Sequence, residues 1–99
     1  MVELPADETI DKMESLLNIA SDSTRLKILY AISEHEKNVS EIVDEVGASQ
    51  SLVSHQLNIL RSADLVSTRK EGTKVFYALA DDHVIALLQV VYDHVTERK

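Results

Sequence analysis

The spacing of apolar residues changes at Asp64, and the change limits the folds that are available to this chain. Before Asp64, apolar side chains return every three or four residues, as they do across residues 8–20, which is typical of helices with one buried face. After it, residues 65–69 and 74–79 form short β-branched or aromatic runs with a period of two, which is typical of strands. The sequence therefore predicts a series of helices followed by a β-hairpin.

Turn-forming residues divide the helical part. Helices are predicted over residues 8–20 and 24–33, over a short segment begun by Ser40, over 50–62 and over about 82–98, with a polar turn at 35–38. Gly47 is suited to end the short helix in the left-handed conformation, and Ser49 is suited to cap the next one. Two helices joined by Gly47-Ala48-Ser49 predict a helix-turn-helix.

The order of these elements predicts the fold class. A hairpin directly after a helix-turn-helix is a wing, so we expect a winged helix-turn-helix, mainly α with one β-hairpin (α+β). The 99 residues suffice for one domain, with the helix-turn-helix at about 40–62, the wing at about 65–79 and the last helix at about 82–98. Because the last helix is apolar almost all round, we expect a partner chain to cover it, in a homodimer through the first and last helices.

Composition excludes several classes of protein. The chain has no cysteine, which removes disulfides and thiolate metal sites. Its acidic N-terminus lacks a secretory pattern, and no apolar run approaches the roughly 20 residues needed to span a bilayer, so a cytoplasmic protein is expected. Catalytic motifs such as HExxH, a Gly-rich phosphate loop or a Ser/His/Asp arrangement are missing, so we do not expect an enzyme.

The distribution of charge predicts a DNA-binding face despite a net charge of −7. Residues 50–77 carry four basic and two acidic side chains and form the only block with a net positive charge. In isolation, polar residues at a helix start are usually a solvated face, and basic residues on a hairpin usually protect its edge. Their position on a helix-turn-helix and a wing favours double-stranded operator DNA as the partner. The predicted contacts are Gln50, Ser51, Ser54, His55, Gln56, Arg61, Arg69, Lys70 and Lys74.

Two histidines and two carboxylates at the ends of the last helix predict a metal site. His83 and His94 lie about 20° apart around the helix but roughly 16 Å apart along it, so one ion cannot bridge them. Two antiparallel copies of the helix would bring Asp81 and His83 of one chain beside His94 and Glu97 of the other, twice per dimer. Four such ligands suit zinc or a similar ion such as cobalt. Taken singly, each residue is more often an ordinary cap or a solvated side chain.

Several stretches carry a family resemblance: SDSTRLKIL, VGASQSLVSHQLNILRSADLV, RKEGTKVFYAL and a final D-x-H-x10-H-x2-E. The chain resembles the ArsR/SmtB family of bacterial metal-sensing winged-helix repressors, in the branch that senses zinc through the last helix. The resemblance implies operator contacts at Gln50, Ser51, Val53, Ser54 and His55. It also implies that the metal-free dimer represses metal-efflux or sequestration genes until metal releases it. Many relatives carry cysteines in the helix before the turn, whereas this chain has Asn38 there, which argues against thiolate sensing of arsenite or lead.

Other interpretations stay open at this point. Asp82 or Asp93 could replace a carboxylate ligand. The regulator could respond to nickel or cobalt, or to no metal, although nickel usually requires six ligands and therefore additional residues. A winged-helix protein-interaction module with no DNA role is the alternative from a different class. The apolar last helix fits both classes, but the basic wing fits only a DNA-binding protein.

Overall fold

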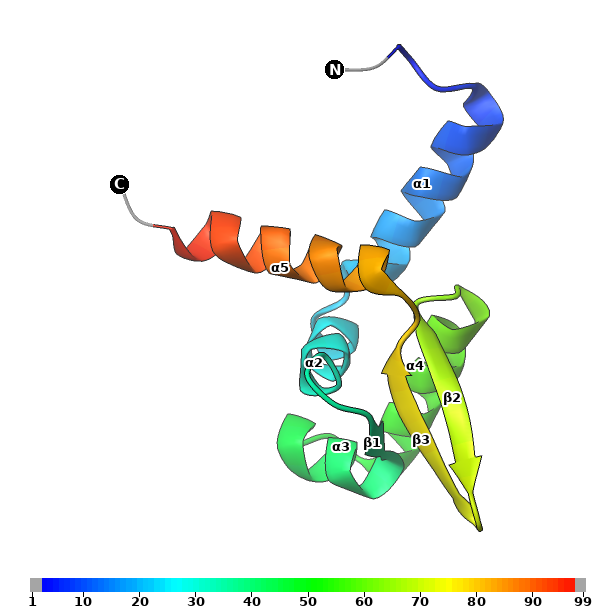
Figure 1. The fold of residues 1–99 in the computed structure, drawn as a ribbon, viewed down its shortest axis with the longest axis vertical. Coiled ribbons are helices and arrows are strands. Elements are labelled where there is room, and N and C mark those ends of the chain that lie inside the picture. The colour runs from blue at the N-terminus through cyan, green and yellow to red at the C-terminus, as the bar shows by residue number, and fades with distance from the viewer. Residues whose placement is uncertain (1–2, 98–99) are drawn as a thin grey trace.

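The computed structural model describes residues 3–97, in which the five helices and the two hairpin strands follow one another in the expected order, with one additional short strand (Figure 1). The elements are α1 (Asp7–Ala20), α2 (Ser23–Ala31), β1 (Lys37–Asn38), α3 (Val39–Val46), α4 (Gln50–Ser62), β2 (Val66–Glu71), β3 (Lys74–Leu79) and α5 (Asp82–Thr96). The winged helix-turn-helix is confirmed as the fold class. None of the helices in this described range is long and apolar enough to cross a membrane.

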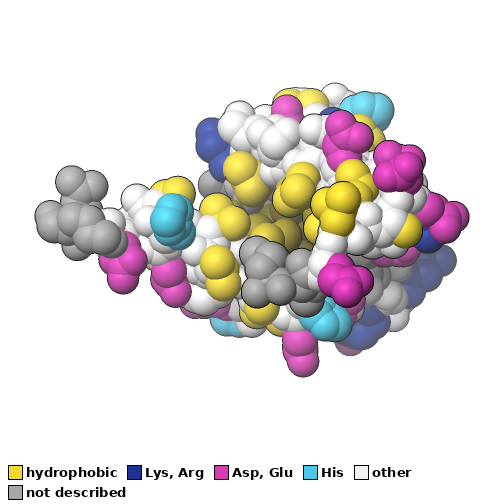
Figure 2. Space-filling model, turned by 90° about the horizontal axis from the view of Figure 1, so that it is seen from above, with side chains coloured by type: hydrophobic (Ala, Val, Ile, Leu, Met, Phe, Trp, Pro, Cys, Tyr) yellow, Lys and Arg dark blue, Asp and Glu magenta, His cyan; other side chains and the backbone are white. Residues whose placement is uncertain are grey.

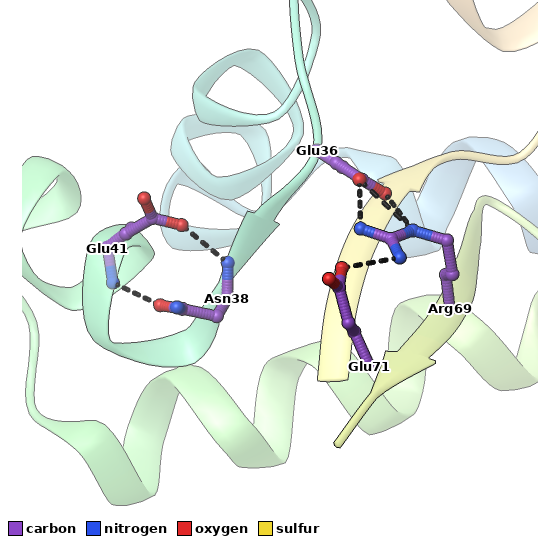
Figure 3. A network of polar contacts seen from close by, with 5 residues as sticks. All are labelled: Glu36, Asn38, Glu41, Arg69 and Glu71. Atoms are coloured by element: carbon purple, nitrogen blue, oxygen red, sulfur yellow. Dashed lines mark hydrogen bonds and ion pairs between the residues drawn. The ribbon is translucent and has the colours of Figure 1, made fainter. Parts of the chain in front are cut away.

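The helix-turn-helix consists of α3 and α4. Its first helix begins two residues earlier than expected, because Asn38 rather than Ser40 is the cap. The Asn38 side chain accepts a hydrogen bond from the Glu41 N–H at 2.9 Å, and the Glu41 carboxylate accepts one from the Asn38 N–H at 2.9 Å (Figure 3). Gly47 ends α3 with φ 79°, and the Ser49 hydroxyl caps α4 by accepting from the Leu52 N–H at 3.2 Å, both as predicted.

The wing is an antiparallel hairpin within a three-stranded sheet of order β1-β3-β2. Gly72 turns the chain between the two long strands with φ 63°. The expected polar turn at 35–38 instead ends in the short strand β1, where Lys37 pairs with Tyr77 and Asn38 with Phe76. This third strand joins the hairpin to the helical body and fixes where the wing leaves it.

The hydrophobic core is formed by α2, α3, α4 and the start of the hairpin. Its most buried side chains, all under 2% exposed, are Ile28, Leu29, Ile32, Ile42, Val53, Leu57, Leu60 and Leu65. At the start of α4, Val53 is fully buried and Leu52 is 39% exposed. The helix-turn-helix therefore packs on its own α2 and hairpin.

The two terminal helices extend away from this core, at the end of the molecule opposite the wing tip (Figure 1). None of the residues of α1 is buried, and in α5 only Val84 and Leu88 are. A hydrogen bond of 2.7 Å from the Tyr30 hydroxyl to the Leu88 carbonyl adds to the attachment of α5. Apolar side chains gather on the face seen in Figure 2. The exposed ones on these two helices are Ile10, Met13, Leu17, Ile85, Val90, Val91, Tyr92 and Val95.

Candidate functional site

The exposed face of α4 carries four of the residues predicted to contact DNA. At about 100° per residue, Gln50, Ser51, Ser54 and Arg61 fall within an arc of roughly 100°. Gln50, Ser51 and Arg61 are exposed and Ser54 is partly exposed. Asn58 lies within the same arc and is exposed, although the sequence analysis did not select it. The sequence does indicate this position, because Asn58 follows Ser54 by four residues and such a spacing places two side chains on one face of a helix. We refer to these five residues as the polar face of α4.

Val53 and Gln56 lie on the other side of α4, and the prediction for Val53 requires a correction. Val53 is fully buried in the core, so its side chain cannot contact DNA as the family resemblance implied. Gln56 is partly buried, and its Oε1 accepts a hydrogen bond of 2.5 Å from Nε of Arg25 in α2. The physical reason is the helical period, which turns positions 53, 56 and 60 toward the body when positions 50 and 54 face solvent.

His55 lies between the polar face and a groove of about 810 Å³ beside α4. The groove runs between α4, the C-terminal half of α1 and the start of α5. His55 lines it together with Lys12 of α1 and with Asp81 and His83 of α5. The first half of the predicted metal site therefore opens onto the same groove as His55 of α4.

Arg69 of the wing is engaged within the protein (Figure 3). Its Nη2 lies 2.6 Å from Oε2 of Glu36, its Nε lies 3.1 Å from both Glu36 oxygens, and its Nη1 lies 2.8 Å from Oε1 of Glu71. The guanidinium also covers the Phe76 ring, 4.9 Å from its centroid. These contacts lower the pKa of the Glu36 carboxyl, chiefly through the hydrogen bonds from Arg69, and raise the pKa of Arg69 through Glu36 and then Glu71.

Arg69 therefore joins β2 to the segment before β1, and its guanidinium is paired with the carboxylates of Glu36 and Glu71. Lys70 and Lys74 lie near the hairpin tip and are exposed, as expected. No ion pair involves either lysine within residues 3–97. Arg61, in the last turn of α4, is exposed as well.

The four predicted metal ligands lie in two pairs at opposite ends of α5. Asp81 caps the helix, its Oδ1 accepting from the Val84 N–H at 3.1 Å, and the same oxygen lies 3.8 Å from Nδ1 of His83. The His83 side chain is 99% exposed, and His94 and Glu97 are exposed at the far end. In the described part of this single chain no three such residues converge into a metal site. The donor set of imidazoles and carboxylates still fits a borderline ion such as zinc, provided that a second copy completes each pair.

Known proteins resemble this chain in both sequence and fold. Residues 22–68 match the arsR family of bacterial regulatory proteins. A transcriptional repressor SmtB homolog from Synechocystis is 37% identical, over 96% of this chain and 72% of that protein. A cadmium resistance transcriptional regulatory protein, a CadC homolog from Staphylococcus aureus, is 37% identical over 78% of this chain and 64% of that protein.

A solved structure extends the likeness to the whole fold. The homodimeric winged helix-turn-helix DNA-binding domain of a Mycobacterium bovis protein superimposes with a TM-score of 0.84 at 25% identity, covering 98% of this chain and 96% of that one. These relatives are DNA-binding transcriptional regulators and not enzymes. Helix α4 is the second helix of the helix-turn-helix, the recognition helix of such regulators, and the hairpin is their wing. With these elements and this degree of sequence identity, the chain belongs to the ArsR/SmtB family of transcriptional regulators.

Proposed function

We propose that this regulator is a homodimeric, zinc-responsive repressor, which binds a pseudo-palindromic operator when metal-free and releases it when metal binds. The genes that it would control are those for metal efflux or sequestration. The polar face of α4 is the observation that carries the DNA-binding part of the proposal. Short hydroxyl and amide side chains of this kind donate and accept hydrogen bonds at base edges and phosphates.

Support for the basic part of the interface comes from the wing. Lys70 and Lys74 are exposed near the hairpin tip, and Arg61 is exposed in the last turn of α4. Each phosphate neutralised by such a side chain releases counterions, so operator affinity should fall steeply with salt. No arginine precedes Arg61 in the recognition helix, so base readout by Gln and Ser gives modest discrimination for one half-site. A dimer doubles the contacts and thereby supplies the remaining specificity.

Support for the dimer comes from the apolar residues exposed on α1 and α5. Leu17 is 55% exposed, Val91 43% and Val95 67%, and their neighbours on both helices are exposed as well. Monomeric proteins rarely expose so many large apolar side chains on neighbouring positions, and a second copy of the chain would cover them. The related Mycobacterium bovis domain is homodimeric.

The metal response is proposed from α5 and from a relative. The pair Asp81 and His83 and the pair His94 and Glu97 are exposed at opposite ends of one helix, so antiparallel packing of two α5 helices would join them into two four-ligand sites. A bound zinc ion would supply a strong, tetrahedral cross-link without an open coordination position. The Staphylococcus aureus relative is named for cadmium resistance, which agrees with a role in metal regulation.

The residues of the chain would produce the response through dimer geometry. With all four ligands engaged, both ends of each α5 are held against the partner, so the angle between the protomers is fixed. The two α4 helices must enter successive major grooves, about 34–36 Å apart, and a changed angle removes that match. Linkage requires the operator to weaken metal binding by the same factor by which metal weakens operator binding.

An anisotropy titration of labelled operator DNA, with and without zinc, tests the proposal. We expect zinc to weaken binding by the wild-type dimer by roughly 5- to 150-fold, the usual range of allosteric coupling. His94→Asn should bind the operator as tightly as the wild type without metal but should not be released by zinc. His35→Asn, which changes an exposed loop histidine, is the matched control.

Three outcomes would contradict parts of the proposal. Normal release of His94→Asn would remove His94 from the ligand set. A cobalt absorption spectrum typical of six-coordination would favour the nickel or cobalt alternative over a tetrahedral zinc site. Weak duplex binding that is indifferent to sequence would favour a protein-interaction module.

A further inference from the structure

One side chain of α2, Arg25, links three helices. Its Nη1 donates a hydrogen bond of 3.0 Å to the carbonyl of Ile19 in the last turn of α1, and its Nε donates to Oε1 of Gln56 in α4 at 2.5 Å. Its own backbone is fixed as well, because the Arg25 N–H donates to the Asp22 cap at 3.1 Å. The Ile19 carbonyl is one of the last four of α1, which have no partner within the helix. The Arg25 side chain therefore donates both to an otherwise unpaired carbonyl at the end of α1 and to a side chain of α4, the recognition helix.

The other attachments of α1 to the domain are few. None of its residues is buried, and only Leu16 and Ile19 pack partly against the core. A groove of about 810 Å³ separates much of the C-terminal half of α1 from α4. The hydrogen bonds of Arg25 are consequently among the main contacts that hold α1 in place relative to α4.

Gln56 is the partner of Arg25 on α4, and its side chain faces the body. Its position is roughly 160° around the helix from Ser54, which lies near the centre of the polar face. Bidentate recognition of adenine by glutamine uses both the amide oxygen and the amide nitrogen. In Gln56 the oxygen already accepts from Arg25, so this mode of readout is closed to it.

We propose that Arg25 and Gln56 are a positioning pair that transmits the placement of α1 to the recognition helix. Gln56 then acts inside the domain and does not contact the operator. The effect on operator affinity rests on the proposed function, because it requires a DNA-binding dimer. The link between the two helices does not, since it follows from the hydrogen bonds of Arg25 alone.

Two acidic substitutions separate positioning from DNA contact. Gln56→Glu keeps an acceptor for Arg25 and adds a charge that strengthens the pair, so operator affinity should stay within about threefold of the wild type. Gln50→Glu is the matched control on the polar face, and its charge beside phosphates should weaken binding by about tenfold or more. Equal losses for the two variants would overturn the proposal, because they would place Gln56 at the DNA.

Gln56→Leu removes the acceptor and tests the positioning role directly. We expect operator affinity to fall by about tenfold or more, as for the loss of one hydrogen bond to a charged group, at protein concentrations that keep both the variant and the wild type dimeric. Recovery of affinity in Gln56→Glu but not in Gln56→Leu would identify the acceptor as the important feature. Wild-type affinity in Gln56→Leu would overturn the proposal.

A distance measurement decides the link without DNA. The chain has no cysteine, so Asp11→Cys in α1 and Ser62→Cys in α4 provide unique sites for spin labels, with labelled protein diluted into unlabelled dimers. The distance distribution between the labels should broaden in Gln56→Leu and stay narrow in Gln56→Glu. Unchanged distributions in both variants would refute the positioning pair. Failure of the wild type to bind any operator would refute only the proposed function.

Discussion

The segment from α2 to β3 and the two terminal helices differ in how they are held. The first segment buries its apolar residues against itself, and Ile28, Ile42, Val53 and Leu57 are each 0% exposed. The terminal helices bury little, and Val95 of α5 is 67% exposed. The comparison shows that the winged helix-turn-helix buries its apolar residues within one chain, whereas α1 and α5 are amphipathic helices that leave much of their apolar surface exposed.

Removing a core side chain should have the largest effect and should confirm that the middle segment supports itself. Leu57→Ala leaves a cavity where no part of the side chain was exposed, and we expect a loss of about 2–5 kcal/mol in the free energy of unfolding. Leu17→Ala in α1 is the control, with the side chain 55% exposed, and should cost far less under conditions that keep the chain monomeric. Denaturant unfolding measures both. Equal losses would remove the distinction between the two regions.

A charge on the apolar face of α5 should break the dimer without unfolding the chain. Val91→Asp places a carboxylate where we propose a second copy packs, and we expect dimer association to weaken by about 2–4 kcal/mol. Analytical ultracentrifugation measures the association, and circular dichroism checks that the fold remains. Lys27→Asp, on an exposed position of α2, should leave association unchanged. An unaffected dimer in Val91→Asp would place the interface elsewhere.

A substitution in the turn of the helix-turn-helix should have a smaller effect on stability than the loss of a core side chain. Gly47 has φ 79°, a left-handed conformation in which a Cβ is strained, although no atom within 4 Å obstructs it. Gly47→Ala should therefore lower the free energy of unfolding by about 1–2 kcal/mol. Gly47→Asn should cost less, because Asn tolerates this conformation better. Thermal denaturation compares the stability of the two variants. An unchanged stability in Gly47→Ala would contradict the expectation, because it would show that the turn can adopt another backbone conformation at no cost.

The smallest effect is expected at the wing. Glu36→Gln weakens the hold on Arg69, so stability should fall slightly while operator affinity rises a few-fold, because the guanidinium becomes available to phosphate. The pKa of Glu36 is lowered in the folded protein. Its contribution to stability is therefore present above the ordinary glutamate pKa and is lost as pH falls through the lowered value. Unfolding at neutral and acidic pH measures this, and an unchanged pH dependence in Glu36→Gln would contradict it.

Local signals were enough to predict most of the fold from the sequence. Gly47 and Ser49 set the limits of the turn, and the change of period at Asp64 predicted the wing. The strand β1 was missed because two residues carry no periodicity, and its partners Phe76 and Tyr77 lie far along the chain. The cap of α3 was misplaced because Asn38 and Ser40 are both good capping residues.

The candidate site was less predictable, since contacts distant in sequence decide which side chains are available. Arg69 was selected for its charge, but its partner Glu36 lies 33 residues earlier. Gln56 was selected for its polarity, but Arg25 engages it from 31 residues away. The metal ligands were selected from spacing on one helix, and the partner that would complete the site is another chain.

The most direct test of the proposed inter-subunit metal site is a mixture of two inactive variants. His83→Asn and His94→Asn each damage both sites of their homodimers, but a mixed dimer keeps one intact site, made of His83 from one chain and His94 from the other. Cobalt titration of the equimolar, re-equilibrated mixture should recover about a quarter of the wild-type tetrahedral sites, while neither variant alone recovers any. No recovery in verified mixed dimers would contradict a site shared between the two α5 helices.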